Sequence, residues 1–350
     1  MIHLLKEVAR GKRGARDLTY GEAVEAAEAI LTQRATPAQI GAFFIAERVK
    51  METVEELEAF VQVGRKYTLR TDSLAPGIDC AGPYDGRKSS FIATFAVAFL
   101  LAAAGLPATL HGAASLPPKR GIVLQDLLQA AGIEAAELTR ERSLHAARRS
   151  GVLYASTELW CPPLASLRPI REQLGMRTVL NSAEKLLDVA TSPFIVFGVY
   201  HNTVFDRLAR LLIKLGYRKA LIVQGAEGSE DLFIDRPTRT YWVENGEFQL
   251  QVYDPETYGL EAPVPEKDWT PQEQVAVAEE VLRGEADLAF TNQVLLNGAA
   301  RLHLAGRVGS LEEGLYACKA LIDGGEALAT YERWLQAMKE PLQAAAPFSS

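Results

Sequence analysis

Hydrophobic residues in the first 70 positions recur at the three- and four-residue spacing of amphipathic helices. This spacing predicts three helices, over residues 20–34, 38–50 and 53–68. Thr36 can cap the second helix, and Pro37 suits its first turn. Thr53 and Glu56 form the capping-box pattern at the start of the third helix. The chain is therefore expected to begin with a small all-helical domain, residues 1–70.

Beyond residue 71, short apolar runs alternate with helical patterns. The apolar runs predict strands over residues 78–82, 107–111, 194–199 and 220–223. The helical patterns cover residues 91–104, 123–131, 204–215, 273–282, 288–304 and 311–322. Asn245 and Gly246 interrupt an alternating stretch, which predicts an antiparallel hairpin over residues 240–253. The expected fold class is α/β, with a large domain at residues 71–350 whose mainly parallel central sheet is flanked by helices and carries the ligand cleft.

Composition changes this picture little. Of the 350 residues, 48% are hydrophobic and 23% are charged, which is typical of a globular protein. The longest apolar run, residues 91–105, is shorter than the roughly 20 residues of a membrane helix, so it predicts a buried helix and no membrane partner. The cysteines Cys80, Cys161 and Cys318 are scattered, which suits a reducing, cytoplasmic location.

Charge is distributed unevenly along the chain. The total is −7, with +3 over residues 1–180 and −10 over residues 181–350. An excess of cations in the first half favours an anionic ligand, although solvated surface charges explain the same pattern.

Several segments, in this order along the chain, resemble anthranilate phosphoribosyltransferases over roughly residues 3–335. Residues 35–57 are similar to their N-terminal helical domain, residues 197–225 to a central strand–helix–strand unit, and residues 297–327 to their C-terminal helices. The resemblance implies a small helical domain on a large α/β domain and a homodimer formed through the N-terminal helices. It also implies transfer of a phosphoribosyl group from phosphoribosyl diphosphate to anthranilate, with Mg²⁺.

The first phosphate loop of that family reads Gly-Thr-Gly-Gly-Asp, followed by Asn-x-Ser-Thr. Pro83 and Tyr84 stand here in place of the adjacent glycines, which let backbone N–H groups approach a diphosphate. Phe91 and Ala93 replace the polar Asn and Ser of the second motif. The matching residues that remain are Asp85, Gly86 and Thr94.

The second loop of the family, Lys-His-Gly-Asn-Arg, matches residues 110–114. His111 and Gly112 remain, but the lysine and the arginine are gone. Four nearby cations are candidates for a rebuilt anion site, with ordinary loop charges as the alternative: Arg87, Lys88, Lys119 and Arg120. Together with the retained loop residues, they form the predicted phosphate-binding set.

Three further positions match functional residues of the family. Glu230 and Asp231 match its magnesium carboxylates in position, with their order reversed, and oxygen ligands suit Mg²⁺. Arg171 matches the arginine that contacts the anthranilate carboxylate, a natural role for a planar guanidinium. The alternatives are an exposed acidic loop and a surface arginine.

The altered loops leave different functions open. The first is a protein with a degenerate phosphoribosyl-diphosphate site that binds a phosphate-bearing small molecule or single-stranded nucleic acid in a basic cleft. Relatives that share the pattern of residues 11–18, 85–88 and 161–163 are associated with nucleic-acid binding. The alternative is an active pentosyltransferase or phosphoribosyltransferase that uses anthranilate or another aromatic acceptor. Little or no activity is expected with anthranilate itself.

Overall fold

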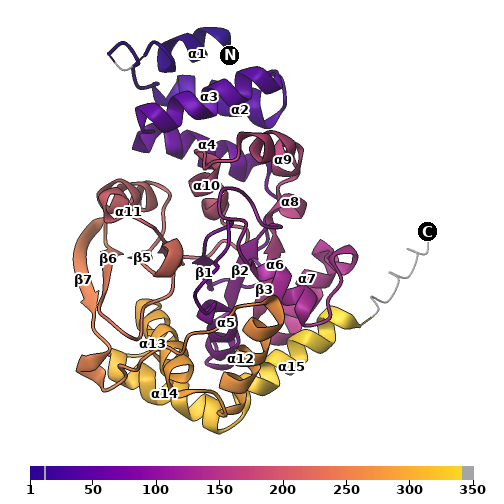
Figure 1. The fold of residues 1–350 in the computed structure, drawn as a ribbon, viewed down its shortest axis with the longest axis vertical. Helices are drawn as coiled ribbons and strands as arrows, with labels where there is room; N and C mark the ends of the chain where they lie inside the picture. The colour runs from indigo at the N-terminus through magenta and orange to yellow at the C-terminus, as the bar shows by residue number, and fades with distance from the viewer. Residues whose placement is uncertain (12, 341–350) are drawn as a thin grey trace.

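The computed structural model describes residues 1–11 and 13–340, so the last ten positions of the predicted α/β domain lie outside the described residues. Four helices form a bundle at one end of the molecule (Figure 1). They are α1 (Ile2–Val8), α2 (Tyr20–Leu31), α3 (Pro37–Lys50) and α4 (Val54–Tyr67). The three predicted helices are confirmed with small shifts at their ends, whereas α1 was not anticipated.

Each of the helices α2, α3 and α4 begins with a complete capping box. Thr19, Thr36 and Thr53 each accept a hydrogen bond from the backbone N–H three positions later. The side chains at those later positions accept in return from the backbone N–H of the threonine. These reciprocal bonds satisfy N–H groups that a helix cannot pair internally, which explains why the helices start where they do.

The central sheet has seven strands in the order β3-β2-β1-β4-β5-β6-β7. The strands are β1 (Ile78–Ala81), β2 (Ala108–Gly112), β3 (Val152–Ser156), β4 (Phe194–Gly198), β5 (Lys219–Val223), β6 (Thr238–Glu244) and β7 (Glu247–Tyr253). The first five are parallel, and β6 and β7 form the predicted antiparallel hairpin. The mainly parallel sheet is therefore confirmed, with β3 as a strand that the pattern did not predict.

One face of the sheet packs against the helices drawn below it in Figure 1. These are α5 (Ala93–Ala103), α12 (Pro271–Arg283), α13 (Leu288–Leu304), α14 (Leu311–Asp323) and α15 (Glu326–Lys339), which share one hydrophobic core with the strands. Helix α5 is buried nearly all round, as its unbroken apolar run predicted. Among the described residues, no helix combines the length and the hydropathy needed to cross a membrane.

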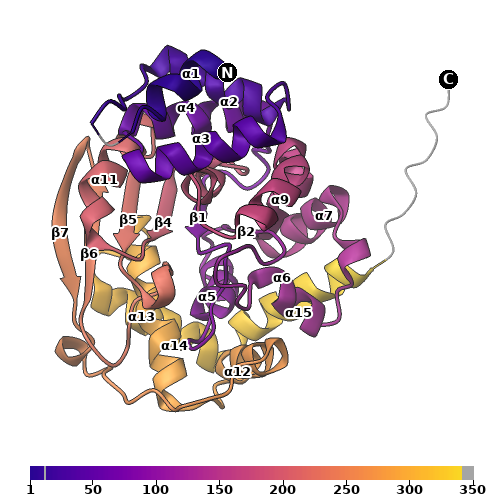
Figure 2. The same ribbon diagram turned by 45° about the horizontal axis from the view of Figure 1, so that its top comes forward.

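The other face belongs to a second core that continues into the helical bundle (Figure 2). Between the bundle and the sheet lie α8 (Thr157–Trp160), α9 (Pro162–Leu174) and α10 (Leu180–Ala183). The remaining helices are α6 (Leu124–Ala130), α7 (Arg140–Ser150) and α11 (Phe205–Lys214). The carboxyl ends of β1, β2, β4 and β5 therefore lead into loops next to α8–α10, where most of the predicted site residues lie.

Candidate functional site

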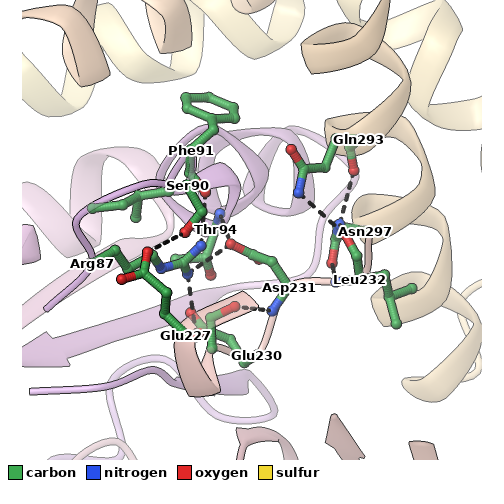
Figure 3. A network of polar contacts seen from close by, with 12 residues as sticks. Arg87, Ser90, Phe91, Thr94, Glu227, Glu230, Asp231, Leu232, Gln293 and Asn297 are labelled. Carbon is green, nitrogen blue, oxygen red and sulfur yellow. Dashed lines mark hydrogen bonds and ion pairs between the residues drawn. The ribbon is translucent and has the colours of Figure 1, made fainter. Parts of the chain in front are cut away.

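Glu230 and Asp231 follow β5 and are fully buried (Figure 3). The Nη2 atom of Arg87 lies 2.7 Å from Asp231 Oδ2 and 3.5 Å from Glu230 Oε2. Arg301, on α13, places its Nη2 atom 3.1 Å from Asp231 Oδ1. Two buried carboxylates thus face two buried guanidinium groups, and the charges within this group balance. We call these four residues the paired cluster.

The same carboxylates are the ones that the family resemblance assigns to Mg²⁺. Magnesium needs several oxygen ligands in near-octahedral geometry. In the part of the chain that the structure describes, no group of three or more His, Cys, Asp or Glu side chains is arranged to hold a metal ion. Arg87 and Arg301 instead pair with the oxygens of these carboxylates.

Close packing keeps the paired cluster in place. A Cβ atom at Gly82, directly after β1, would lie 2.7 Å from Glu230 Oε2, so a side chain there would push the Glu230 carboxylate aside. Arg87 is further held because its Nη1 donates to the carbonyl of Phe91 at 2.7 Å. The backbone N–H of Thr94 donates to Asp231 Oδ2 at 3.2 Å, so this predicted phosphate ligand also supports the cluster.

The side chain of Tyr84, from the first loop, is buried against residues of other elements. Its hydroxyl lies 2.6 Å from Nδ1 of His111 and 2.8 Å from Oγ1 of Thr157. Nε2 of His111 lies 2.8 Å from Oδ1 of Asp79, so both ring nitrogens of this predicted phosphate ligand face protein atoms. Burial raises the pKa of the Tyr84 hydroxyl well above its ordinary value, so it stays neutral.

Two of the predicted phosphate-binding glycines, Gly86 and Gly112, have structural roles through their backbone atoms. Gly86 has φ of +78°, and a Cβ atom there would lie 2.4 Å from the backbone of Gly121. A side chain is therefore excluded on both counts. Gly112, at the end of β2, accepts a hydrogen bond from Thr157 Oγ1 through its carbonyl at 3.0 Å.

The backbone N–H groups of the first loop are bound by a carboxylate from the chain itself. Glu227 accepts from the backbone N–H of Lys88 at 2.9 Å and of Ser89 at 3.1 Å (Figure 3 shows Glu227 beside this loop). Burial raises the pKa of Glu227, but the N–H groups of Ser89 and Lys88, together with the Ser90 hydroxyl and the charge of Lys119, outweigh it and hold the pKa below its ordinary value. Glu227 thus stands as an anion where a phosphate is expected from the sequence.

Asp85 also has partners from other elements. Its Oδ2 lies 2.6 Å from Nη2 of Arg177, and its Oδ1 lies 3.5 Å from Nζ of Lys119. Lys119 additionally donates to the carbonyl of Glu227 at 2.8 Å. The structure thus brings the predicted residues Asp85 and Lys119 together and adds Arg177, which was not among the predicted site residues.

The remaining predicted cations lie apart from this group. Arg120 is largely exposed and pairs with Glu172, while Lys88 is exposed on the surface of the first loop. Arg171 is buried, and its two terminal nitrogens lie 2.6 and 2.8 Å from the two carboxylate oxygens of Glu184. The guanidinium expected to receive an acceptor carboxylate thus already holds one from its own chain.

A cavity of about 180 Å³ lies beyond the carboxyl end of β4. Its polar lining includes Asp85, Arg177, Asn181 and Lys185. Lys185 is buried, donates from Nζ to the carbonyl of Gly198 at 2.8 Å, and lies 4.0 Å from the centroid of the Phe197 ring. Burial lowers the pKa of Lys185 to about 8. Lys185 was not among the predicted site residues, although a charged Glu184–Lys185 pair within an apolar stretch was a visible signal.

Comparisons with known proteins agree with this architecture. The α/β domain of the glycosyl transferase family matches residues 81–328, and the helical bundle domain of that family matches residues 2–67. These matches define a glycosyl transferase fold built from the same two parts. The anthranilate phosphoribosyltransferase of Symbiobacterium thermophilum is 33% identical over 337 residues, which cover 95% of this chain and 96% of the relative. That of Methylocella silvestris is 32% identical over 341 residues, covering 96% and 95%.

Solved structures show the same similarity. The crystal structure of anthranilate phosphoribosyltransferase from Thermus thermophilus has a TM-score of 0.82 at 26% identity, covering 96% of this chain and 99% of the other. The Saccharomyces cerevisiae enzyme in complex with PRPP and Mg shares the fold, with a TM-score of 0.81 at 18% identity, covering 96% and 97%. The chain belongs to the anthranilate phosphoribosyltransferase family of glycosyl transferases.

Proposed function

We propose that this chain is a pentosyltransferase that takes a donor of the phosphoribosyl-diphosphate type and an aromatic acceptor without a carboxylate. Relatives named as anthranilate phosphoribosyltransferases, similar over nearly the whole chain, support the reaction class. The pair between Arg171 and Glu184 is the observation that carries the acceptor class. An incoming carboxylate would have to displace one that is tethered to the chain and bonded at both oxygens.

Catalysis of this kind depends on positioning and on stabilisation of charge. The bond to the donor diphosphate breaks as the acceptor nitrogen approaches, so positive charge develops on the sugar and negative charge on the diphosphate. Magnesium accompanies PRPP in the yeast relative. In this chain, Glu230 and Asp231 are the carboxylates that would hold the ion, and Arg87 would first have to leave them.

Release of diphosphate from PRPP tests the proposal. The full chain is assayed with Mg²⁺ and with either anthranilate or aniline, which lacks the carboxylate. We expect release with aniline and little with anthranilate. Glu184→Gln removes the internal carboxylate charge from Arg171, so it should shift the preference towards anthranilate, whereas the surface variant Glu172→Gln should not. Absence of diphosphate release with any aromatic acceptor would overturn the transferase proposal, and faster release with anthranilate would overturn the acceptor class.

A second candidate is binding without transfer, to a phosphate-bearing ligand such as single-stranded nucleic acid. The first loop argues against a bound donor diphosphate, because Tyr84 is buried at this loop and Glu227 binds its N–H groups, so a phosphate ligand would have to bind elsewhere in the cleft. Fluorescence anisotropy with a labelled single-stranded oligonucleotide measures such binding directly. Affinity should fall steeply with salt, and binding that is absent or independent of salt rejects this candidate.

We also propose that residues 1–70 form a dimerisation domain and residues 71–350 carry the cleft. Three apolar side chains on or beside α1 and α3 support the dimer, since Ile2, Val49 and Met51 are each more than half exposed. Val49→Glu should convert a dimer into a monomer in light scattering. Leu250→Glu, on the exposed edge strand β7, serves as the control. A monomeric wild-type chain would reject the proposal that residues 1–70 form a dimerisation domain.

A further inference from the structure

The cavity beyond β4 brings together cations from separate segments. Lys185 comes from the 3₁₀ turn Glu184–Leu186, and Arg177 from the segment between α9 and α10. Its volume of about 180 Å³ is several times the roughly 30 Å³ share of a water molecule, so a tetrahedral anion has room there.

Lys185 differs from the other buried cations in its surroundings. In the described part of the chain, the contacts of its ammonium group are the carbonyl of Gly198 and the ring of Phe197, which are both neutral. A buried charge without a counter-ion is costly, and proteins normally pair it. Because Lys185 lines the cavity, an anion entering from solvent can supply the missing negative charge.

Arg177 is the second cation of the site. Its side chain is about one-third exposed, and Nη2 binds Asp85 Oδ2 at 2.6 Å. Asp85 reaches it from the loop after β1, so this carboxylate occupies a place that a ligand oxygen can take. Lys119 holds the other oxygen of Asp85 at 3.5 Å.

We propose that Lys185 and Arg177 form a phosphate-binding site at the carboxyl end of β4, and that the carboxylate of Asp85 competes with the phosphate for Arg177. The inference rests on the proposed function in that the phosphate is taken to be part of the donor. It assigns the phosphate contacts to residues outside the two loops that the family resemblance indicates.

The larger surface hollow, of about 750 Å³, is less suited to an anion. Four acidic residues line it against two basic ones: Glu227, Asp235, Glu266, Asp268, Arg236 and Lys267. Glu227 also lines the smaller cavity, but there Lys185, Arg177 and Arg207 outnumber Glu227 and Asp85, so the smaller cavity is the more favourable one for phosphate.

The charge on Lys185 depends on groups from several elements. Burial lowers its pKa to about 8, Glu230 from the β5 loop and Asp85 from the β1 loop raise it, Arg177 lowers it, and the neighbouring Glu184 raises it. The ammonium is therefore charged below about pH 8 and loses its proton above it. Affinity for an anion should fall as the pH rises through this value.

Binding of inorganic diphosphate to the full chain, measured by isothermal titration calorimetry in EDTA, tests the site. Lys185→Met should weaken binding by about tenfold or more, because a buried charged contact is lost. Asp85→Asn should strengthen it several-fold, since the competing charge is removed. Lys319→Met, which removes an exposed cation from α14, should leave the affinity within about twofold. Equal affinity of the wild-type chain and Lys185→Met, or no binding to the wild-type chain, overturns the site, and weaker binding by Asp85→Asn overturns the competition.

The wild-type chain provides a test that does not depend on folding of a variant. Sulfate is the probe because its own charge stays constant between about pH 7 and about pH 9, the interval in which Lys185 loses its proton. Binding should weaken across this interval, and binding that is independent of pH overturns the proposal. Anion binding that depends on Lys185 without diphosphate release from PRPP supports this site and rejects the transferase. Diphosphate release that is unaffected by Lys185→Met supports the transferase and rejects this phosphate site.

Discussion

The paired cluster and the cavity beside Lys185 lie near the same edge of the sheet but handle buried charge differently. In the paired cluster, Arg87 and Arg301 face Glu230 and Asp231, and charges balance within the chain. Lys185 is equally buried, yet its contacts are a carbonyl and an aromatic ring. A balanced group needs no ligand and links β5 to α13, whereas a buried cation beside a cavity gains from an anion. Burial of a charge therefore does not by itself indicate a binding site. A buried charge indicates one only where its contacts within the protein are neutral and a cavity lies beside it.

Arg171 belongs with the paired cluster in this comparison. It was selected from the sequence as an acceptor ligand, but Glu184 binds both of its terminal nitrogens. The adjacent residue along the chain is Lys185, so one short 3₁₀ turn contributes both a paired anion and a cation that pairs with no carboxylate among residues 1–11 and 13–340. Glu184 is therefore paired within the chain like the residues of the paired cluster, whereas the next residue, Lys185, has neutral contacts.

The largest expected effect comes from breaking the paired cluster. Arg301→Met leaves Asp231 facing a single arginine in a buried position, and it should lower the free energy of unfolding by about 3–5 kcal/mol. Urea denaturation followed by circular dichroism measures this change. Adding Asp231→Asn to the same chain should recover part of the loss, because the uncompensated charge is then removed. A loss below about 1 kcal/mol for the single variant would mean that the cluster contributes little to stability.

A smaller effect of opposite sign is expected at the cavity. The folded chain holds the pKa of Lys185 at about 8, below its value of 10.5 in the unfolded chain, so burial of the charge costs stability in full below pH 8. Lys185→Met should therefore raise the free energy of unfolding by about 1–3 kcal/mol at neutral pH.

The pH dependence separates this explanation from simple repacking. As the pH rises from about 8 to 10.5, the wild-type chain recovers the cost, because the folded chain has released the lysine proton while the unfolded chain still binds it. The advantage of Lys185→Met should shrink over this interval in urea denaturation. A destabilised variant at neutral pH, or a gain that is constant with pH, would contradict the assignment of Lys185 as an uncompensated cation.

The smallest effect is expected for Arg120, whose side chain is more than half exposed and pairs with Glu172. Arg120→Gln should change the free energy of unfolding by less than about 1 kcal/mol, because exposed ion pairs contribute little. Diphosphate affinity should also stay within about twofold of the wild-type value. A large loss of affinity would show that Arg120 contributes to the anion site predicted from the sequence. It would also weaken the distinction between the paired cluster and the cavity beside Lys185.

Much of the fold was predictable from local patterns. The alternation around Asn245 and Gly246 predicted the β6–β7 hairpin, and the capping residues placed the starts of α3 and α4. The unforeseen elements differ in their local signals. Strand β3 was overlooked although it is as long as the predicted strands β2, β4 and β5. Helix α9 begins with two prolines and contains Pro169, so proline argued against a helix there.

The sequence by itself determined the α/β class, the helical bundle and the family, because these depend on periodicity and on motifs that are local in the chain. It also drew attention to Arg87, Asp85, Arg171, Glu230 and Asp231. Only the tertiary structure decided what these residues contact. Arg87 and Asp231 are more than 140 positions apart, and Lys185 meets Gly198 and Phe197 only because the sheet places them together. Ion pairing and desolvation depend on distances in space, and a linear pattern does not contain those distances.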